Sequence, residues 1–574
     1  MYERNYDLIS KKFREFFLPT LFTSMAGNIC FVIDSMMVAF LIGEFNLSVM
    51  QLVSPVTTFV NLIYWMIGLG GSVLCSVSKA EFDERKSNSY FTVSVFSLLI
   101  IGVILSVGGL VFSNQIVHFL CRAENLLTLV SQFFNAYIIG LPFLCYIMCL
   151  SYFVRADGLP KMAFRAILLS NIVNICCDVI FISVLNLGIS GAAYATVVGY
   201  IVGSIYISTY FFKSERTLRL INLKLNRFLT YLKKICKSGF SGASTQLYFT
   251  FKAFIYNTLI TIFIGEAGLV AFGICDNSLF ILYMFLIGAA QTMSPIVSVY
   301  FKEEDYEGVK FIVKKALKIA LTSSLIFAIL IIIYPDMLLT LYSVKNPSFI
   351  PVVFNAVRIF ALSYVGTAIT FLYTFYAEAI QKDLLASIIS LLEGLIVPCA
   401  SAFILAYLIG GNGIWISFTI AEVVTILFIL MYSKYINKKS NGEFSGFFIN
   451  KHNDDKDVFE YTIQGNVKDA VELSAKVQKY LKDYKVATQV SLVIEEIIVN
   501  IIKLNDHVDL IDVIVKIQED YILVSVKDSG VEYNPIVEQD ELNFDNISVL
   551  NKIADKIDYS RVLGLNSTVI TIKK

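Results

Sequence analysis

The amino-acid sequence changes character near residue 433, and this change limits what the chain can fold into. From Leu18 to Tyr432, apolar stretches follow one another with only short polar breaks. Each is about 20 residues long, the length that crosses a lipid hydrocarbon core as a helix. Of all residues, 56% are hydrophobic and the mean hydropathy is +0.70, more than the surface of a soluble protein tolerates. We expect an α-helical polytopic membrane protein followed by a soluble α/β domain.

The apolar stretches predict twelve transmembrane helices in two six-helix halves. Their centres fall near Ile29, Tyr64, Ile101, Leu141, Asn174, Ile201, Phe251, Met284, Ile326, Tyr364, Val397 and Val423. The motif Gly188-Ile189-Ser190-Gly191 recurs as Gly410-Gly411-Asn412-Gly413, which favours an internal repeat with a cavity between the halves. The expected domains are an N-terminal half (1–212), a connecting loop (213–238), a C-terminal half (239–432), a linker (433–456) and a soluble domain (457–574).

The distribution of basic residues predicts the orientation. One set of alternate loops carries most of the Lys and Arg residues, including the loop from Lys213 to Lys237, whereas the opposite set offers little beyond Arg122 and Lys345. The positive-inside rule then places both termini in the cytoplasm of a multi-pass plasma-membrane protein. The formal net charge is zero without long runs of like charge, so no nucleic-acid partner is expected. Ten scattered cysteines indicate buried thiols rather than a metal site.

Carboxylates inside apolar spans are candidate functional residues. An ionised carboxylate costs several kcal/mol at the middle of a bilayer, so such a residue usually faces a cavity and has a function. Asp34 and Asp178 are the clearest cases. Asn174 lies one helical turn before Asp178 on the same face, so we expect its amide to hydrogen-bond that acid. Glu393 and Glu422 are weaker candidates.

Two further acids, Asp276 and Glu266, are expected near the outer interface in a solvated structural role.

The soluble domain contains a second group of polar residues. Its predicted elements include strands over Leu510–Ile517 and Tyr521–Val526 and a short helix over Ile547–Asp555. Glu496 and Asn500 are four residues apart and therefore share a helix face. A glutamate there could act as a general base, and the asparagine oxygen could bind Mg²⁺. Asp528 and Gly530 follow a predicted strand, where the carboxylate could accept a hydrogen bond from adenine and the glycine would let the base approach the backbone.

The membrane part resembles the multidrug and toxic compound extrusion (MATE) family. The matching segments are Val154 to Pro160, Asn171 to Asp178, Leu187 to Thr196, Ile33 to Ser35, and Gly413 to Trp415 with Glu422. The resemblance covers roughly residues 10–435. It implies export of drugs or metabolites coupled to inward flow of H⁺ or Na⁺, with the cation site formed by Asp34, Asn174, Asp178 and Thr196. An acidic residue that another branch of the family carries in span seven has no match, which favours H⁺.

The soluble domain resembles the histidine-kinase-like ATPase superfamily, particularly the serine-kinase branch of anti-sigma factors. Glu496 and Asn500 match the N box, Asp528, Gly530 and Pro535 match the Asp-x-Gly…Pro motif, and Gly564-Leu565-Asn566 precedes the final strand. The family's phosphate-binding Gly-x-Gly is replaced by Phe544-Asp545-Asn546. Without those glycines the backbone approaches phosphate less closely. The resemblance leaves three roles open: an active kinase or ATPase with Glu496 as catalytic base, a nucleotide sensor binding ATP and Mg²⁺, or a protein-docking module.

The leading functional prediction is a cation-coupled exporter regulated by its C-terminal domain. The expected partners are a small-molecule cargo, the lipid bilayer and a small cytoplasmic regulatory protein. A lipid-linked oligosaccharide flippase and a membrane-tethered serine kinase are the alternatives. An apolar, aromatic-rich cavity suits many amphipathic molecules, so the sequence does not determine the cargo.

Overall fold

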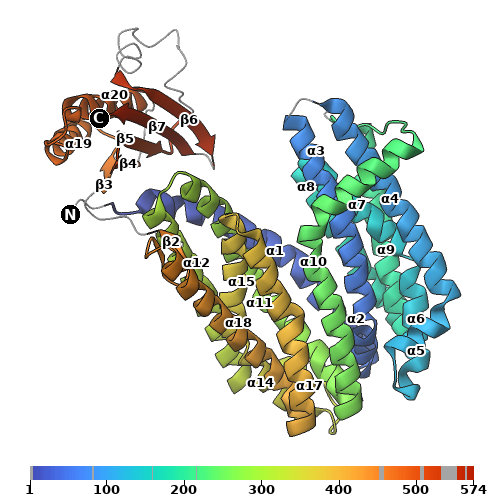
Figure 1. The fold of residues 1–574 in the computed structure, drawn as a ribbon. Helices are drawn as coiled ribbons and strands as arrows, with labels where there is room; N and C mark the ends of the chain where they lie inside the picture. Colours follow the sequence, from blue (N-terminus) through green and yellow to red (C-terminus); the bar gives the residue numbers. More distant parts are fainter. Residues whose placement is uncertain are drawn as a thin grey trace. The chain divides into compact units, whose positions relative to one another are not determined.

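Long helices dominate the chain up to residue 439 (Figure 1). The computed structural model describes residues 4–80, 83–157, 159–214, 216–451, 458–504, 510–531, 553–562 and 565–574. The helices of the first half are α1 Asp7–Ile42, α2 Phe45–Tyr64, η1 Trp65–Leu69, α3 Gly70–Ala80, α4 Glu84–Val111, α5 Ser113–Leu120, η2 Glu124–Leu126, α6 Leu127–Ile138, α7 Leu141–Ala156, α8 Pro160–Asp178, η3 Val179–Val184, α9 Gly188–Ser208 and η4 Thr209–Phe212. Those of the second half are α10 Leu225–Phe263, α11 Glu266–Lys302, α12 Tyr306–Ile333, α13 Asp336–Leu341, α14 Ile350–Ala361, α15 Tyr364–Ala379, α16 Asp383–Leu391, η5 Leu392–Ile396, α17 Val397–Ile409 and α18 Gly411–Lys439.

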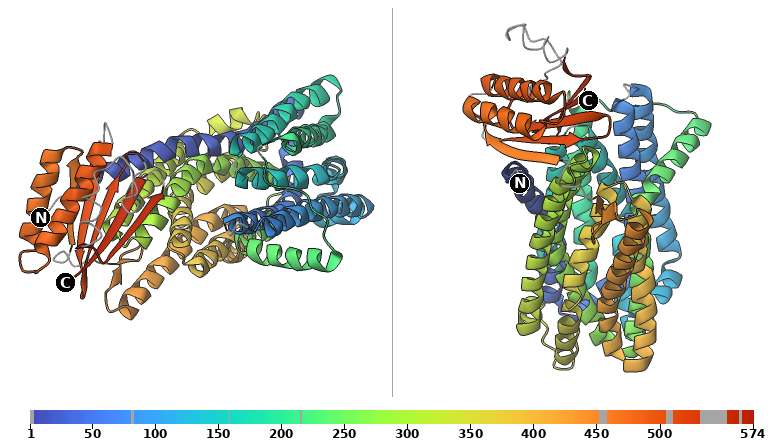
Figure 2. Two further views of the ribbon diagram at one scale, coloured as in Figure 1. Left: turned by 90° about the horizontal axis from the view of Figure 1, so that it is seen from above. Right: turned by 60° about the vertical axis from the view of Figure 1, so that its left-hand side comes forward.

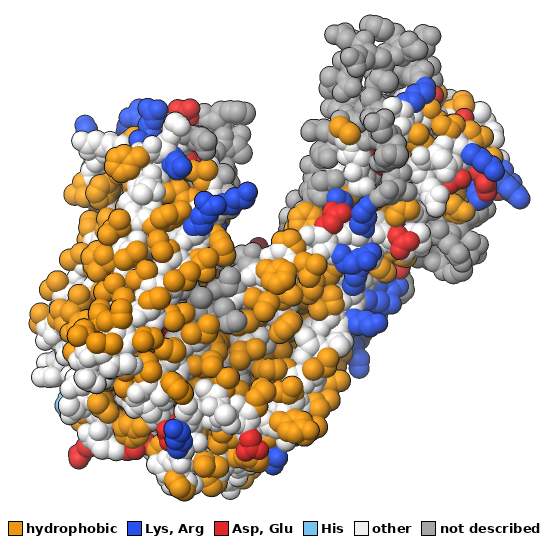
Figure 3. Space-filling model, turned by 180° about the vertical axis from the view of Figure 1, so that it is seen from behind, with side chains coloured by type: hydrophobic (Ala, Val, Ile, Leu, Met, Phe, Trp, Pro, Cys, Tyr) orange, Lys and Arg blue, Asp and Glu red, His pale blue; other side chains and the backbone are white. Residues whose placement is uncertain are grey.

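Eight of the described helical segments are long and apolar enough to cross a membrane. The pairs α6–α7 and α14–α15 are bent by 48° and 45°, and counting each pair as one span gives up to ten. Helix length and composition therefore support eight to ten spans and do not establish the expected twelve. On the face drawn in Figure 3, hydrophobic side chains cover the lengths of the helices, as lipid contact requires.

The described part of the chain forms two compact units. The helical unit comprises Leu21–Ala289 and Leu317–Ile429. The C-terminal unit comprises Met1–Thr20, Ala290–Ala316 and Leu430–Lys574. The soluble domain thus belongs to the same unit as the N-terminal end of α1, the connection between α11 and α12, and the end of α18.

Glycine allows the close packing of α10 in the helical unit. A Cβ atom added to Gly239 would lie 1.9 Å from the Met66 carbonyl oxygen, and one added to Gly70 would lie 2.6 Å from the Gly239 Cα atom. Met66 lies in η1 and Gly70 begins α3, so these backbones meet with no space for a side chain. The run Gly68-Leu69-Gly70-Gly71 therefore has a packing role here.

A five-stranded antiparallel sheet forms the body of the soluble domain. Its elements are β3 Val458–Gln464, α19 Val467–Tyr480, α20 Ala487–Leu504, β4 Leu510–Ile517, β5 Tyr521–Asp528, β6 Lys556–Val562 and β7 Leu565–Lys573. The strand order is β3-β4-β5-β7-β6. Helices α19 and α20 lie on one face of this sheet (Figure 2), where they bury alternate strand residues such as Ile511, Val513 and Val515. The side chain of Asn466 accepts a hydrogen bond from the Asp469 amide and caps α19.

Some boundaries differ from the sequence prediction. Helix α18 continues to Lys439, and β1 Phe444–Ser445 pairs with β2 Asn450–Lys451, so part of the expected linker has regular structure. Helix α10 already begins at Leu225, within the expected connecting loop. In both places the helix extends beyond its apolar stretch, because polar and basic residues also favour helical geometry. The helix expected over Ile547 to Asp555 lies mostly outside the described residues.

The packing at Gly239 gives a testable consequence for stability. Gly239→Ala should destabilise the protein by about 1–3 kcal/mol, because the new methyl group overlaps the backbone of η1. Thermal unfolding of the detergent-solubilised protein measures this as a lower Tm. Gly108→Ala is the matched control, since an added Cβ there meets nothing within 4 Å and alanine favours a helix. Equal Tm values for the two variants would contradict the packing role.

Candidate functional site

Two carboxyl groups meet inside the helical unit. Asp34 lies on α1, and Asp178 is the last residue of α8. Asp178 is fully buried, and its side chain interacts directly with that of Asp34. Neither oxygen of Asp178 accepts a hydrogen bond from a described N–H or hydroxyl group. Two carboxyl groups can hydrogen-bond each other only when one carries a proton, so this pair can hold a proton.

Asn174 and Thr196 complete the group around Asp34. With its nitrogen toward Asp34, the Asn174 amide donates to Asp34 Oδ1 over 3.2 Å and accepts from the Thr196 hydroxyl over 3.2 Å. This orientation satisfies both ends of the amide, which is how such amides are assigned. The sequence predicted support of Asp178 by Asn174, whereas these hydrogen bonds go to Asp34 and Thr196. The four predicted residues nevertheless come together.

Local backbone features hold these side chains close. A Cβ atom added to Gly199 on α9 would lie 2.5 Å from the Ser170 carbonyl oxygen and 3.1 Å from Asn174 Cβ, so Gly199 lets α9 approach α8. Directly after Asp178 the chain forms the π-helical segment η3. Such segments change the direction of the following side chains and are frequent at functional sites.

Two tyrosines extend this group, and the sequence analysis did not single them out. Tyr200 on α9 lies one turn after Thr196 and interacts electrostatically with Asp34. Its hydroxyl also interacts with that of Tyr137 on α6. The four-residue spacing from Thr196 was the available signal, because it places both residues on one face of α9.

A second carboxylate group lies in the other half of the helical unit. Glu422 on α18 accepts hydrogen bonds from Thr367 Oγ1 over 2.8 Å and from Thr370 Oγ1 over 2.7 Å, both on α15. A Cβ atom added to Gly366 would lie 2.5 Å from Glu422 Cβ, so glycine allows this close approach. Glu393 lies within the π-helical segment η5 and also contacts Thr370. Each half thus has a carboxylate at or beside a π-helical segment.

Lys252 on α10 is a basic residue of this second group that the sequence analysis missed. It interacts electrostatically with Glu393, Glu422 and Asp276, and its ammonium group lies 4.8 Å from the Phe249 ring centroid. The signal was present, since Lys252 is the sole charged residue between Lys237 and the end of α10.

Asp276, expected to be solvated near the outer interface, is half-buried and accepts a hydrogen bond from Gln51 Nε2 over 3.3 Å. Asp276 lies on α11, and its hydrogen bond comes from the neighbouring helix α2, which carries Gln51.

The residues singled out in the soluble domain lie between the sheet and α20. Asp528 ends β5 and is buried, and its Oδ1 atom accepts from the Gly530 amide over 2.7 Å and from Asn566 Nδ2 over 2.9 Å. Asn500 on α20 is buried, and Glu496 has one buried carboxylate oxygen without a hydrogen bond from the described residues.

The segment expected at the phosphates, Phe544-Asp545-Asn546, lies outside the described residues, as do Pro535 and Gly564. Within the described part of the chain, no group of three or more His, Cys, Asp or Glu side chains could hold a metal ion.

The fold and the intramembrane carboxylates define a polytopic helical membrane protein with internal repetition. The MatE family model matches the chain twice, over residues 19–180 and 243–404. The chain belongs to the MatE family, with one match in each half.

Curated relatives and solved structures agree. The multidrug export protein MepA of Staphylococcus haemolyticus is 24% identical over 432 residues, which cover 74% of this chain and 93% of the relative. MepA of Staphylococcus aureus strain MRSA252 is 22% identical over 420 residues, which cover 73% and 92%. Among structures, an inward-facing multidrug resistance MATE transporter matches with a TM-score of 0.65 at 20% identity, covering 73% of this chain and 96% of that one. An outward-facing MATE transporter matches with a TM-score of 0.59 at 19% identity, covering 77% and 99%.

The threonine hydroxyls at Glu422 can be tested by their effect on stability. Thr367→Val and Thr370→Val should each destabilise the protein by about 1–3 kcal/mol, because each leaves a buried carboxylate oxygen without a donor. Thr374→Val is the control on the same helix, since its hydroxyl donates only to the Thr370 carbonyl within α15. If all three variants melted at the same temperature, the hydrogen bonds to Glu422 would not matter for stability.

Proposed function

We propose that this protein exports drugs or other amphipathic molecules in exchange for an inward-moving cation, with H⁺ as the coupling ion rather than Na⁺. The observation that carries the proposal is the direct pairing of Asp34 with buried Asp178. Membership of the MatE family and the names of the MepA relatives support export of multiple drugs. The absence of an acidic residue from α10, where Lys252 lies instead, supports H⁺ over Na⁺.

The carboxyl pair gives a physical basis for coupling. With one shared proton, Asp34 and Asp178 attract each other through a hydrogen bond, whereas two ionised carboxylates in a low-dielectric interior repel. Binding and loss of one proton therefore changes the preferred separation of α1 and α8. Asn174 and Thr196 hold Asp34 in place during this change. A cavity that opens to alternate sides can use such a change to exchange proton and cargo.

The proposed topology has twelve spans with both termini in the cytoplasm. The eight helices and the two bent pairs supply ten spans. Helices α1 and α10, 36 and 39 residues long, are the remaining two. The excess of Lys and Arg in one set of loops supports this orientation in the plasma membrane.

Asp178→Asn and Asp34→Asn should each abolish gradient-driven export, because the amide preserves shape but cannot gain or lose the coupling proton. The measurement is efflux of a fluorescent cationic dye from proteoliposomes under an imposed pH gradient, with a Na⁺ gradient as a parallel arm. Glu266→Gln is the matched control. Wild-type export rates in both Asp variants would overturn the assignment, and export driven by Na⁺ alone would overturn H⁺ coupling.

For the soluble domain we propose nucleotide binding with a regulatory role, acting with a small cytoplasmic partner. Asp528, Gly530 and Asn566 form a connected polar group beside α20, and Glu496 keeps a carboxylate oxygen without a described partner. These residues fit the base and metal ends of ATP–Mg²⁺: Asp528 would bind the adenine, Asn500 the metal, and Glu496 would be the base of any turnover. Bound ATP would supply a transferable phosphoryl group.

The expected result is weak ATP–Mg²⁺ binding by the full-length protein with slow or no turnover. Asp528→Asn should weaken binding at least ten-fold, because the amide presents a donor where the adenine amino group needs an acceptor. Equilibrium binding of a fluorescent ATP analogue to the detergent-solubilised protein measures this, with the exposed residue Asp520→Asn as control. If the wild type did not bind ATP at millimolar concentration, nucleotide binding would be wrong and protein docking would be the remaining role of the soluble domain. Phosphate release that is lost in Glu496→Gln would show an active enzyme.

A further inference from the structure

The second face of the soluble domain's sheet carries a row of polar residues, most of them buried. Thr462, Asp512, Lys527 and Ser567 lie directly opposite one another across β3, β4, β5 and β7. Lys516 lies on the same face, four residues after Asp512. Asp512 is fully buried, and Lys516 and Lys527 are 5% and 2% exposed. An antiparallel sheet with helices on one face commonly leaves its other face in water, so something must cover this polar row.

The cover is the connection between α11 and α12. Lys527 Nζ lies 2.5 Å from Glu303 Oε2 and 3.5 Å from Asp305 Oδ2, and it lies 3.6 Å from the Tyr300 ring centroid. The Ser567 hydroxyl donates to Glu303 Oε1 over 2.7 Å. Lys516 Nζ donates to the carbonyl oxygens of Glu304 and Glu303 over 2.5 and 3.3 Å. The sheet therefore recognises both the side chains and the backbone of this connection.

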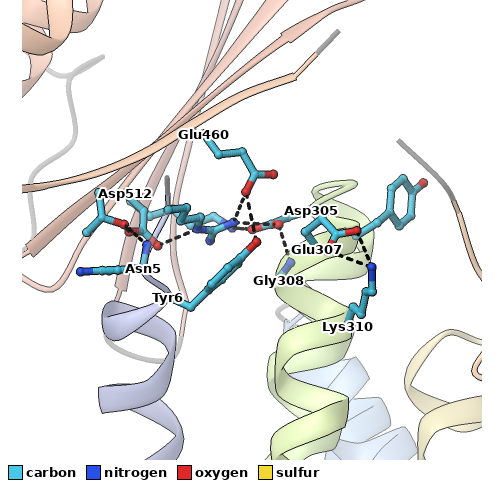
Figure 4. A network of polar contacts seen from close by, with 12 residues as sticks. Asn5, Tyr6, Asp305, Glu307, Gly308, Lys310, Glu460 and Asp512 are labelled. Carbon is cyan, nitrogen blue, oxygen red and sulfur yellow. Dashed lines mark hydrogen bonds and ion pairs between the residues drawn. The ribbon is translucent and has the colours of Figure 1, made fainter. Parts of the chain in front are cut away.

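Arg4 joins the N-terminal end of the chain to the same contact, where Asp305, Glu460 and Asp512 come together from different elements (Figure 4). Its Nη1 atom lies 2.9 Å from Asp305 Oδ1 and 3.6 Å from Glu460 Oε2, and its Nε atom lies 3.1 Å from Asp512 Oδ2. The Arg4 side chain is 1% exposed. Two residues further on, the Tyr6 ring stacks on Phe311 of α12 at 4.9 Å between ring centroids.

This cluster contains more negative than positive groups. Arg4, Lys516 and Lys527 face the carboxylates of Glu303, Asp305, Glu460 and Asp512. Burial opposes ionisation of Asp305, but the charges of Arg4 and Lys527 outweigh it and hold the pKa of that carboxyl well below its usual range. Removing one member of a buried ion cluster leaves uncompensated charge, so the contact is specific and sensitive to single substitutions.

The cluster connects parts of the chain that belong to different halves of the transporter. Arg4 immediately precedes α1, which carries Asp34 farther along. Asp305 lies within the second family match and accepts a hydrogen bond from the Gly308 amide at the start of α12. On the sheet, the pair Lys527–Ser567 and the pair Asp528–Asn566 are consecutive rungs of β5 and β7. The polar row that contacts the connection between α11 and α12 and the polar group at Asp528 therefore occupy neighbouring residue pairs of the same two strands.

We propose that the soluble domain acts as a brake on export by docking through this buried ion cluster, which fixes the N-terminal end of α1 to the connection between α11 and α12. The proposal rests on the export function proposed above. Alternating access requires the two halves to move relative to each other. A contact that forms in only one arrangement stabilises that arrangement and slows its exchange with the other.

A release assay tests the docking independently of export. A protease site is inserted between Asn453 and Asp454 of the full-length protein, and the solubilised protein is cut and separated by size. The wild-type domain should stay with the membrane part, whereas Arg4→Gln and Asp512→Asn should release it. Arg14→Gln and Asp558→Asn are matched controls, since both side chains are exposed. Release of the wild-type domain, or its retention in both cluster variants, would overturn the docking.

An export assay on the uncut proteins then tests the brake. Arg4→Gln and Asp512→Asn should each raise the export rate about five-fold, the lower end of typical coupling between sites. The double variant should export no faster than either single one, because both changes break the same contact. Arg4→Lys, which keeps the charge, should fall between wild type and Arg4→Gln.

Release of the domain with unchanged, slower or additive export would overturn the brake while the docking stands. A wild type that exports nothing would overturn the export function and the brake together, and the release assay would still report on the docking.

Discussion

A charged group removed from water must find a partner, and this requirement organises both units of the protein. Asp34 and Asp178 face each other inside the helical unit. Glu422 takes two threonine hydroxyls, and Lys252 lies among three acids. Because unpaired charge is costly at these positions, each group fixes the relative positions of the helices that supply it.

Close helix approach makes these pairings possible. Asp, Asn and Thr side chains are short, so they meet across a helix interface only when the backbones are near each other. Gly199 brings α9 to α8 beside Asn174, and Gly366 brings α15 to α18 beside Glu422. Gly70 and Gly239 bring the first half to the second. In a membrane, where small residues allow such contacts, these glycines determine which polar groups can share a proton or a hydrogen bond.

The soluble domain uses its sheet in two ways. Alternation along each strand sends Ile511, Val513 and Val515 into the core under α19 and α20. The intervening Asp512 and Lys516 go to the opposite face. On that face Asp512, Lys516 and Lys527 are buried, but their contacts are polar and involve distant parts of the chain. The sheet thus packs against α19 and α20 with one face and contacts the connection between α11 and α12 with the other.

Sequence alone determined the features that depend on local pattern. Apolar stretches gave the positions of the membrane helices, alternation gave β4 at Leu510–Ile517, and charge inside an apolar stretch identified Asp34 and Asp178 as functional candidates. The same pattern predicts twelve spans, whereas the length and composition of the described helices support eight to ten. It assigned Asn174 to Asp178, since neighbours on one helix are visible in sequence and neighbours on another helix are not.

Only the tertiary structure decided which distant groups meet. Arg4 is an unremarked residue near the start of the chain, yet its partners Asp305 and Asp512 are 301 and 508 positions away. Lys252 gains its acidic neighbours from α11, η5 and α18. Hydrophobicity and periodicity are properties of each segment by itself, whereas electrostatic pairing depends on distance in space. The fold sets that distance when it packs the segments together.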